Sequence, residues 1–302
     1  MIPGIAGGGA MGALFAYFFQ RAGMEWRLYE TSDVVRRSFR QGVSVKFGGA
    51  DTLLAGNVSG DPGILSGCGM VLLFVKSYST ADAIAAIAPS LDRDAVVVSL
   101  QNGLGNAQVI ARAVGTGRLV YGSTVIGAAK TDPHTVVHGG GSRVTIGGAN
   151  ADATGRVDRA LTRAGLDVMV SATPEEIVWR KAIINAAINP LGALLDVPNG
   201  ALLDLPGVAD LQDAIVTEAA AVARARGLGF DTASLRREVS EVCASTAKNL
   251  CSMLQDLRAG RRTEIQAING AIAAFGEESG IPVPYNRALT LLVLAKESAS
   301  SR

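Results

Sequence analysis

The hydrophobic positions follow two different patterns along the chain. In the first half, short and mostly apolar runs at 2–6, 26–29, 70–75 and 95–99 alternate with longer segments that have a helical spacing. Such runs are typical of parallel strands that helices cover on both faces. The pattern therefore predicts an α/β domain, a Rossmann-type doubly wound fold, over residues 1–170.

Strand patterns stop near residue 170, and helical patterns replace them. Thr173-Pro-Glu-Glu176 has the composition of a capping box with proline at the first helical position, which predicts that a helix begins here. Pro190 is expected to kink or end that helix, because proline has no N–H to donate. Further helices are predicted at 208–226, 235–258, 263–279 and 285–298. Residues 171–302 are therefore expected to form an all-α domain.

Composition and charge narrow the class of protein. The chain has 302 residues, of which 48% are hydrophobic and 18% charged, so it can bury the cores of two domains. Its 28 basic and 27 acidic residues form no long basic block, which argues against nucleic acid or a membrane surface as a partner. Three scattered cysteines and two histidines predict neither a disulfide framework nor a zinc site. We expect a cytoplasmic protein without a signal peptide or a membrane span.

A glycine-rich segment follows the first predicted strand. Gly7-Gly8-Gly9-Ala10-Met11-Gly12 has the spacing G-x-G-x-x-G, in which the glycines allow a tight turn, approach of a pyrophosphate and close helix–strand contact. The N–H groups at the start of the next helix then face the phosphates. Such a motif is weak alone, because glycine-rich N-termini are common.

Three more polar residues follow predicted strands. Glu30, Lys76 and Asn102 come after the second, third and fourth runs, and carboxyl ends of parallel strands share the edge where such sheets bind ligands. An acid at Glu30 can bind the ribose 2′-hydroxyl of NAD and repel the 2′-phosphate of NADP. An ordinary surface role for Glu30 is the alternative, and Arg36 and Arg37 can reach a 2′-phosphate. The sequence predicts a dinucleotide site and leaves the choice of dinucleotide open.

Two histidines lie on or near the segment 135–147, which is predicted to form a β-hairpin that closes the first domain. A catalytic role for His134 or His138 is the less favoured alternative. Roles in the turn and on the surface are favoured.

The helix predicted after Thr173 carries an unusual polar stripe. Lys181, Asn185 and Asn189 are four residues apart and share one face, whereas the other faces are apolar. Buried amides often join helices, but a buried ammonium is costly unless it is paired. With a nicotinamide partner, Lys181 can protonate the oxygen of a ketone that accepts hydride, while the asparagines hold other substrate oxygens. Glu264 is a candidate to pair with Lys181; a solvated glutamate at a helix start is the alternative.

Several segments together resemble one family. I-A-G-G-G-A-M-G, W-R-K-A-I-I-N-A-A-I-N-P-L, V-P-N-G, N-L-C-S-M-L-Q-D and T-E-I-Q-A-I-N-G resemble ketopantoate reductases (2-dehydropantoate 2-reductases) over residues 2–298. The resemblance implies reduction of 2-dehydropantoate to (R)-pantoate with NADPH, on the way to pantothenate and coenzyme A.

The resemblance also implies roles for individual residues. Lys181 is implied to be the general acid, with Glu264 at the junction of cofactor and substrate. Cofactor contacts are implied at Gly7, Gly8, Gly9, Ala10, Met11, Gly12, Lys76, Asn102 and Ala128. Substrate contacts are implied at Asn102, Lys181, Asn185, Asn189, Asn199, Asn249 and Ser252.

The sequence departs from the family pattern at one place. The family usually has a basic residue after the second strand for the 2′-phosphate, whereas this chain has Tyr29-Glu30-Thr31-Ser32. NADPH is thus implied by the resemblance and NADH by Glu30. An NAD-dependent D-2-hydroxyacid dehydrogenase of the mandelate type is the alternative enzyme.

The sequence favours an enzyme over a non-catalytic nucleotide-binding regulator, because a regulator has no use for Lys181. The apolar segment 289–294 can pack internally or against a second subunit, so monomer and homodimer both fit.

Overall fold

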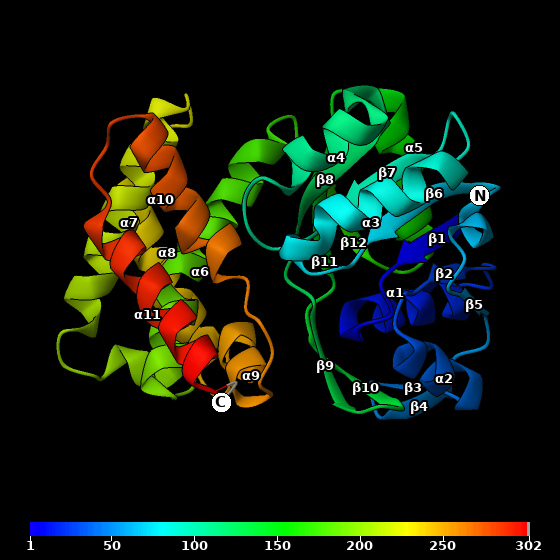
Figure 1. The fold of residues 1–302 in the computed structure, drawn as a ribbon, viewed down its shortest axis with the longest axis horizontal. Helices are drawn as coiled ribbons and strands as arrows, with labels where there is room; N and C mark the ends of the chain where they lie inside the picture. Colours follow the sequence, from blue (N-terminus) through cyan, green and yellow to red (C-terminus); the bar gives the residue numbers. More distant parts are fainter. Residues whose placement is uncertain (301–302) are drawn as a thin grey trace. The chain divides into compact units, whose positions relative to one another are not determined.

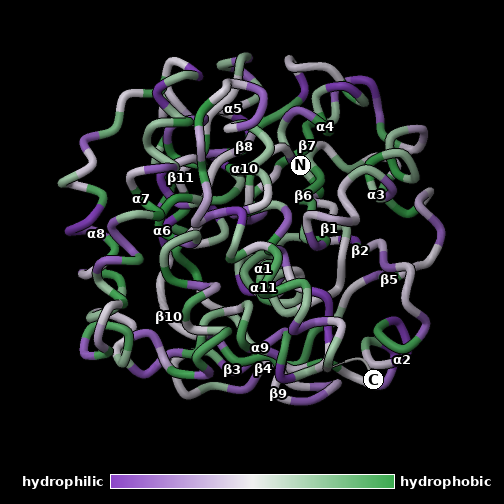
Figure 2. The backbone as a smooth tube through the Cα atoms, turned by 60° about the vertical axis from the view of Figure 1, so that its left-hand side comes forward, coloured by the Kyte–Doolittle hydropathy of each residue, from purple (hydrophilic) through white to green (hydrophobic). Residues whose placement is uncertain are grey.

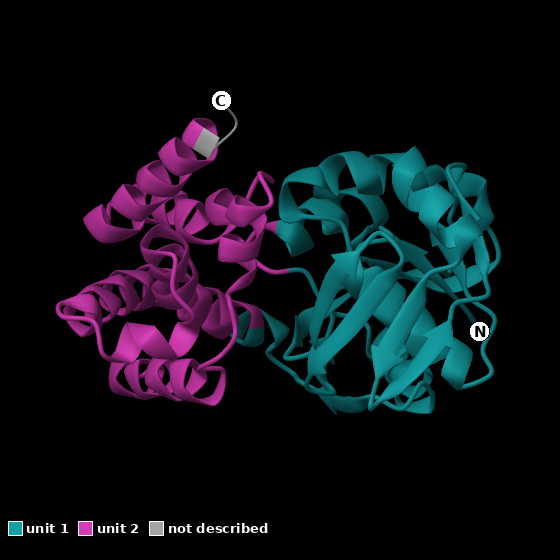
Figure 3. Ribbon diagram, turned by 90° about the horizontal axis from the view of Figure 1, so that it is seen from below, with its two compact units in different colours: residues 1–101, 106–177 teal, residues 102–105, 178–302 magenta. Residues whose placement is uncertain are grey.

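The computed structural model describes residues 1–300 and divides into the two compact units coloured in Figure 3. The first unit contains residues 1–101 and 106–177, and the second contains residues 102–105 and the chain from residue 178 onward. The predicted domains, residues 1–170 and 171–302, stay a prediction, because a compact unit of the structure is not necessarily a domain that folds independently.

The first unit is built on an eight-stranded sheet (Figure 1). In spatial order its strands are β12 (Asp167–Val170), β11 (Arg143–Gly147), β8 (Leu119–Thr124), β7 (Val96–Ser99), β6 (Cys68–Leu73), β1 (Ile2–Ala6), β2 (Arg27–Tyr29) and β5 (Asn57–Ser59). The strands from β8 to β5 are mutually parallel, and β11 pairs antiparallel with β8 and parallel with β12. The four predicted strands correspond to β1, β2, β6 and β7 and are confirmed.

Helices cover both faces of this sheet. They are α1 (Ala10–Arg21), α2 (Asp33–Gln41), α3 (Thr80–Ile87), α4 (Asn106–Val114) and α5 (Ala151–Arg163). On β6, Met70 and Leu72 belong to the same core cluster as the buried side chains of α1 and α5. Val71 and Leu73 belong to the cluster that includes α3 and α4. Successive side chains therefore serve opposite faces, which explains the continuous hydrophobic colour of β6 and β7 in Figure 2.

A second, four-stranded sheet corrects one prediction. Its strands in order are β4 (Ala50–Leu53), β3 (Ser44–Phe47), β10 (Thr135–Gly140) and β9 (Gly127–Asp132). The expected hairpin over 135–147 is wrong, because β10 pairs with β9 and β3 whereas β11 joins the main sheet. Gly140 and Gly141 have φ values of 102° and 78°, and these left-handed residues redirect the chain from one sheet to the other.

The second unit is helical. Its elements are α6 (Pro174–Leu195), which begins in the first unit, α7 (Val208–Ala225), α8 (Thr232–Ser245), α9 (Ser252–Arg258), α10 (Asn269–Glu278), α11 (Pro284–Ser300) and the short 3₁₀ segments η5 (Asn199–Leu203) and η6 (Ile265–Ala267). The predicted helix start at Pro174 and the helices 208–226 and 285–298 are confirmed. No helix within residues 1–300 is both long and apolar enough to cross a membrane.

Two predicted helices differ from the structure. The single helix expected over 235–258 is broken between α8 and α9, where the backbone of residues 246–251 bonds to η5 instead. Asn199 N donates to Asn249 O at 3.0 Å, and Gly200 N donates to Ala247 O at 3.1 Å. The helix expected to begin at residue 263 begins at Asn269, after η6. Tertiary hydrogen bonds here outweigh helix propensity.

Pro190 was expected to kink or end its helix, and the second of these outcomes is wrong. The helix α6 continues through Pro190 to Leu195. Proline leaves the carbonyl four residues earlier, that of Ala186, without its helical donor. Asn269 Nδ2 donates to this oxygen at 3.1 Å, so the missing bond is replaced from another helix.

Candidate active site

The glycine loop between β1 and α1 has the geometry of a phosphate cradle. Gly7 has φ of 107°, and a Cβ there would lie 2.8 Å from Phe74 O. A Cβ on Gly12 would lie 1.9 Å from Gly7 O, so only glycine lets α1 approach the loop this closely. Gly9 has no atom within 4 Å of an added Cβ, and it caps α1 without a side-chain hydrogen bond. The first backbone N–H groups of α1 therefore face open space, and an anion can bind to them there.

Glu30 lies directly beside this loop. Its Oε2 accepts a hydrogen bond from Gly8 N at 2.7 Å, and its Oε1 accepts one from Ser32 N at 2.7 Å. The carboxylate thus lies at the carboxyl end of β2, at the position from which an acid can receive ribose hydroxyls. Arg36 is already engaged nearby, because its Nη1 donates to the carbonyls of Glu30 (2.6 Å) and Thr31 (2.7 Å). A phosphate would have to draw Arg36 away from these partners.

Sequence reasoning missed Lys130 on β9. Burial lowers the pKa of Lys130 below its usual value, and the nearby carboxylate of Glu30 partly opposes that shift. Lys130 is two residues from Ala128, so the alternation of side chains along a strand places both on one face of β9. That alternation was the signal that could have linked Lys130 to the cofactor contact predicted at Ala128.

Lys76 and Asn102 follow the adjacent parallel strands β6 and β7. Gln101 Nε2 donates to Val75 O at 2.8 Å and so ties together the two segments that lead to them. Asn102 begins the short segment 102–105, in which Leu104 N donates to Ala267 O at 2.7 Å. Within the second unit, this bond holds the segment that carries Asn102 against η6.

The polar stripe on α6 includes a lysine with a strongly altered acidity. Burial lowers the pKa of Lys181 from 10.5 to about 8, and the carboxylate of Glu264 acts in the opposite direction. Glu264 is itself 8% exposed and immediately precedes η6. The buried Glu264 and the partly exposed Lys181 carry opposite charges within electrostatic reach of each other, and the net effect brings the pKa of the lysine closer to neutral pH.

Other predicted substrate residues surround the break between α8 and α9. Asn189 is buried, and its carbonyl oxygen accepts a hydrogen bond from Cys251 Sγ at 3.4 Å. Asn199 Nδ2 donates to Thr246 Oγ1 at 2.8 Å, while its buried Oδ1 has no hydrogen-bond partner within residues 1–300. A buried acceptor of this kind is suited to a ligand donor such as a hydroxyl.

The side chains of Asn249 and Ser252 differ from these, because both are exposed. Asn249 is linked to Asn199 through the backbone, and Ser252 is the first residue of α9. Their substrate contacts stay predictions.

The two histidines make structural contacts. His134 Nδ1 lies 3.0 Å from Gly42 O, and His138 Nε2 lies 2.8 Å from Gly141 O. The ring of His138 also stacks on Phe47 at 4.6 Å. These contacts agree with roles in the turn and the small sheet.

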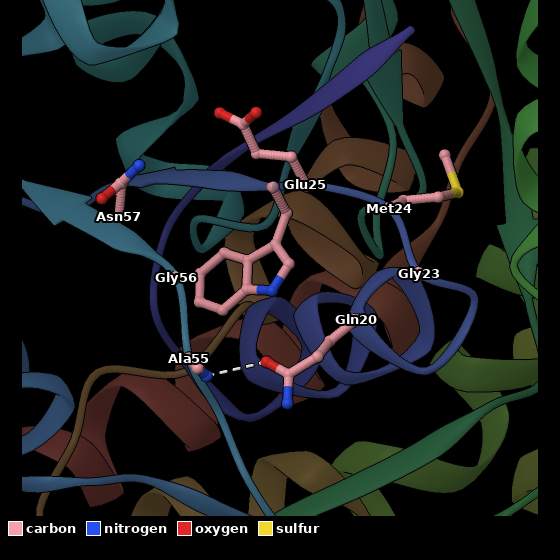
Figure 4. A pocket seen from close by; sticks show the side chains of 8 residues that line it. Gln20, Gly23, Met24, Glu25, Ala55, Gly56 and Asn57 are labelled. Carbon is pink, nitrogen blue, oxygen red and sulfur yellow. Dashed lines mark hydrogen bonds between the residues drawn. The ribbon is translucent and has the colours of Figure 1, made fainter.

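A pocket of about 490 Å³ elsewhere in the first unit is a poorer candidate for the dinucleotide site than the glycine loop (Figure 4). It is lined by Gln20, Gly23, Met24, Glu25, Trp26, Ala55, Gly56 and Asn57. Both ends of the Gln20 amide are used, since Nε2 donates to Leu53 O and Oε1 accepts from Ala55 N. The pocket also lies at the amino end of β2, opposite the edge where parallel sheets bind ligands.

Comparison with known proteins decides the family. Residues 4–151 match the family described as ketopantoate reductase PanE/ApbA, and residues 175–297 match its C-terminal counterpart. A 2-dehydropantoate 2-reductase from Halobacterium salinarum is 39% identical over 240 residues, which cover 78% of this chain and 78% of that protein. The chain belongs to the ketopantoate reductase family. The resemblance found in the sequence is thereby confirmed.

Solved structures confirm the predicted fold class for this member of the ketopantoate reductase family. A PanE/ApbA family ketopantoate reductase from Ralstonia eutropha is 30% identical, with a TM-score of 0.91 and full coverage of both chains. D-mandelate dehydrogenase in complex with NADH and anilino(oxo)acetate is 25% identical, with a TM-score of 0.95 and full coverage of both chains.

Proposed function

We propose that this chain reduces 2-dehydropantoate to (R)-pantoate with a nicotinamide coenzyme. The observation that carries the proposal is the partly buried Lys181, whose pKa is lowered to about 8 on the same helix face as Asn185 and Asn189. A 2-dehydropantoate 2-reductase is 34% identical over 97% of this chain, against 25% over the full chain for D-mandelate dehydrogenase, which favours the smaller aliphatic substrate. Both relatives support a 2-oxo acid as the substrate class.

The glycine loop and Glu30 fit a dinucleotide. Gly9 leaves room for a pyrophosphate at the start of α1, and the carboxylate of Glu30 can exchange its bond to Gly8 N for ribose hydroxyls. A reduced nicotinamide bound there supplies the hydride for the ketone carbon. We infer that NADH is preferred, because Glu30 repels a 2′-phosphate and Arg36 is already engaged.

Lys181 performs the proton transfer. A ketone that gains hydride becomes an alkoxide, which is far too basic to leave without a proton. The ammonium of Lys181 polarises the ketone oxygen and then donates a proton to it, and the pKa near 8 makes that transfer easy at neutral pH. The amides of Asn185, Asn189 and Asn199 donate to the substrate carboxylate or accept from its hydroxyl.

The pH dependence follows from the acidity of Lys181. Since Lys181 must be protonated to act as the acid, kcat/KM for reduction should fall about tenfold per pH unit above pH of about 8. Glu264 raises the pKa of Lys181, so Glu264→Gln should move this basic limb to lower pH. Steady-state rates across pH would measure the shift. Glu277→Gln, at an exposed position on α10, is the matched control. If the basic limb of the pH profile is at the same pH in Glu264→Gln as in the wild type, the carboxylate of Glu264 does not raise the pKa of Lys181.

Cofactor preference has its own test. Glu30→Ala and Glu30→Arg should raise the ratio of kcat/KM for NADPH to that for NADH by about tenfold or more, because a carboxylate no longer faces the 2′-phosphate. Glu25→Ala is the control, since Glu25 is an exposed acid at the other end of β2. An unchanged ratio in both Glu30 variants would refute the ribose contact.

Analysis of the product tests the proposed reaction itself. Incubation with 2-dehydropantoate and NADH or NADPH should yield (R)-pantoate, identified by chiral chromatography, with one coenzyme oxidised per molecule formed. Absence of pantoate with both coenzymes, in a preparation that binds NADH, would contradict the proposal.

A further inference from the structure

The helix that carries Lys181 contains a proline in its interior, where proline normally destabilises a helix. Pro190 lies inside α6, which continues for five residues beyond it to Leu195. A helical residue at position 190 would donate its N–H to the carbonyl of Ala186, and proline cannot. Ala186 is buried, so water does not readily replace the missing donor.

Asn269 supplies the donor from α10. Its side chain is 0% exposed, and its Nδ2 donates to Ala186 O at 3.1 Å and to Asn286 Oδ1 at 3.0 Å. Both N–H bonds of this amide are therefore used, one on α6 and one on α11. Ala186 directly follows Asn185, so the amide holds the turn of α6 between the two asparagines of the polar stripe.

The direction of these hydrogen bonds is fixed by a carboxylate. Glu218 on α7 can only accept, and its Oε2 receives Asn286 Nδ2 at 2.8 Å and Asn286 N at 3.0 Å. Asn286 Nδ2 also donates to Ile215 O at 3.3 Å. The oxygen of Asn286 must then face Asn269, which forces Asn269 to present its NH₂ group to Ala186.

We propose that Asn269 is a positioning residue whose amide replaces the hydrogen bond that Pro190 removes and thereby aligns Lys181, Asn185 and Asn189. The alignment matters for catalysis only if the proposed function holds. The hydrogen-bond replacement does not depend on that function.

A double-mutant cycle between positions 190 and 269 tests the proposal. Asn269→Ala should lower Tm by about 4–8 °C and kcat/KM by about tenfold, because the buried Ala186 O and Asn286 Oδ1 both lose their donor. In a Pro190→Ala background the new N–H serves Ala186 O. The same Asn269→Ala change then leaves only Asn286 Oδ1 without its donor, so it should lower Tm by about half as much, about 2–4 °C, and kcat/KM by less than about threefold.

A neighbouring amide provides the matched control. Gln212 is 7% exposed, and its Nε2 donates to Ala187 O at 3.3 Å, on the same helix but to a carbonyl whose donor is not Pro190. Gln212→Ala should therefore have the same effect on Tm and kcat/KM in both backgrounds. If Asn269→Ala alone does not fold, recovery of folded protein in the double variant gives the same support.

The outcomes separate this proposal from the proposed function. Equal penalties for Asn269→Ala in both backgrounds would show that Asn269 is merely part of the core and would overturn the proposal. Rescue of Tm without rescue of kcat/KM would overturn the positioning role. Thermal unfolding needs no substrate, so an enzyme inactive on 2-dehydropantoate would refute the proposed function while the Tm cycle still tested the hydrogen bond.

Discussion

Replacing Lys181 with alanine is expected to lower kcat for 2-dehydropantoate reduction by at least about 100-fold, the scale of general acid catalysis. The alkoxide would then have no positioned donor, since Lys181 is the residue on α6 whose burial lowers its pKa to about 8. Affinity for NADH should be retained, because the glycine loop and Glu30 belong to the other unit. Steady-state kinetics together with NADH titration would measure both quantities.

Two variants sharpen this prediction. Lys181→Arg keeps the positive charge but cannot release a proton at neutral pH, so its rate should fall nearly as far. Lys248→Ala, at an exposed position in the second unit, should leave the rate unchanged. A Lys181→Ala enzyme whose rate is within about tenfold of the wild-type rate would show that Lys181 is not the general acid. An active Lys181→Arg enzyme would show that Lys181 acts through its positive charge and not through proton transfer.

Replacing Gly12 with alanine should disrupt the first unit. The new Cβ would lie 1.9 Å from Gly7 O, so α1 and the glycine loop must move apart. That movement disturbs the helix that buries Phe15, Phe18 and Phe19. We expect a loss of at least about 3 kcal/mol, and a fall in Tm of about 6–12 °C or failure to fold. Thermal unfolding monitored by circular dichroism would show it.

The same substitution at Gly9 is the matched comparison. An added Cβ there meets no atom within 4 Å, so Tm should change by less than about 3 °C. Affinity for NADH should nevertheless fall by about tenfold or more, because the methyl group occupies the space beside the first N–H groups of α1. Wild-type NADH affinity in Gly9→Ala, or a wild-type Tm in Gly12→Ala, would contradict the geometry of the loop.

Much of the fold was predictable because burial leaves a pattern in the sequence. The strand β7 is buried on both faces, so Val96, Val97 and Val98 form a continuous apolar run. The path between β10 and β11 was not predictable, since the left-handed Gly140 and Gly141 allow both a hairpin and a change of sheet. The break after α8 depends on bonds from Asn199 and Gly200, which are remote in sequence.

The candidate site was predictable to a similar extent. Helical periodicity placed Lys181, Asn185 and Asn189 on one face, and all three lie on α6. Glu264 was already a candidate partner of Lys181 in the sequence, but the net lowering of the Lys181 pKa was not predictable, because it depends on how far folding removes the amine from water. The role of Asn269 was hidden too, since the carbonyl that it serves is 83 residues away and is freed by Pro190.

The most direct measurement compares kcat/KM for 2-dehydropantoate with that for benzoylformate, an aromatic 2-oxo acid, each with NADH and with NADPH. We predict that 2-dehydropantoate exceeds benzoylformate by at least about tenfold with the better coenzyme, which corresponds to about 1.4 kcal/mol of transition-state binding. Efficient reduction of benzoylformate with little or no turnover of 2-dehydropantoate would contradict the proposed function and would favour a D-2-hydroxyacid dehydrogenase.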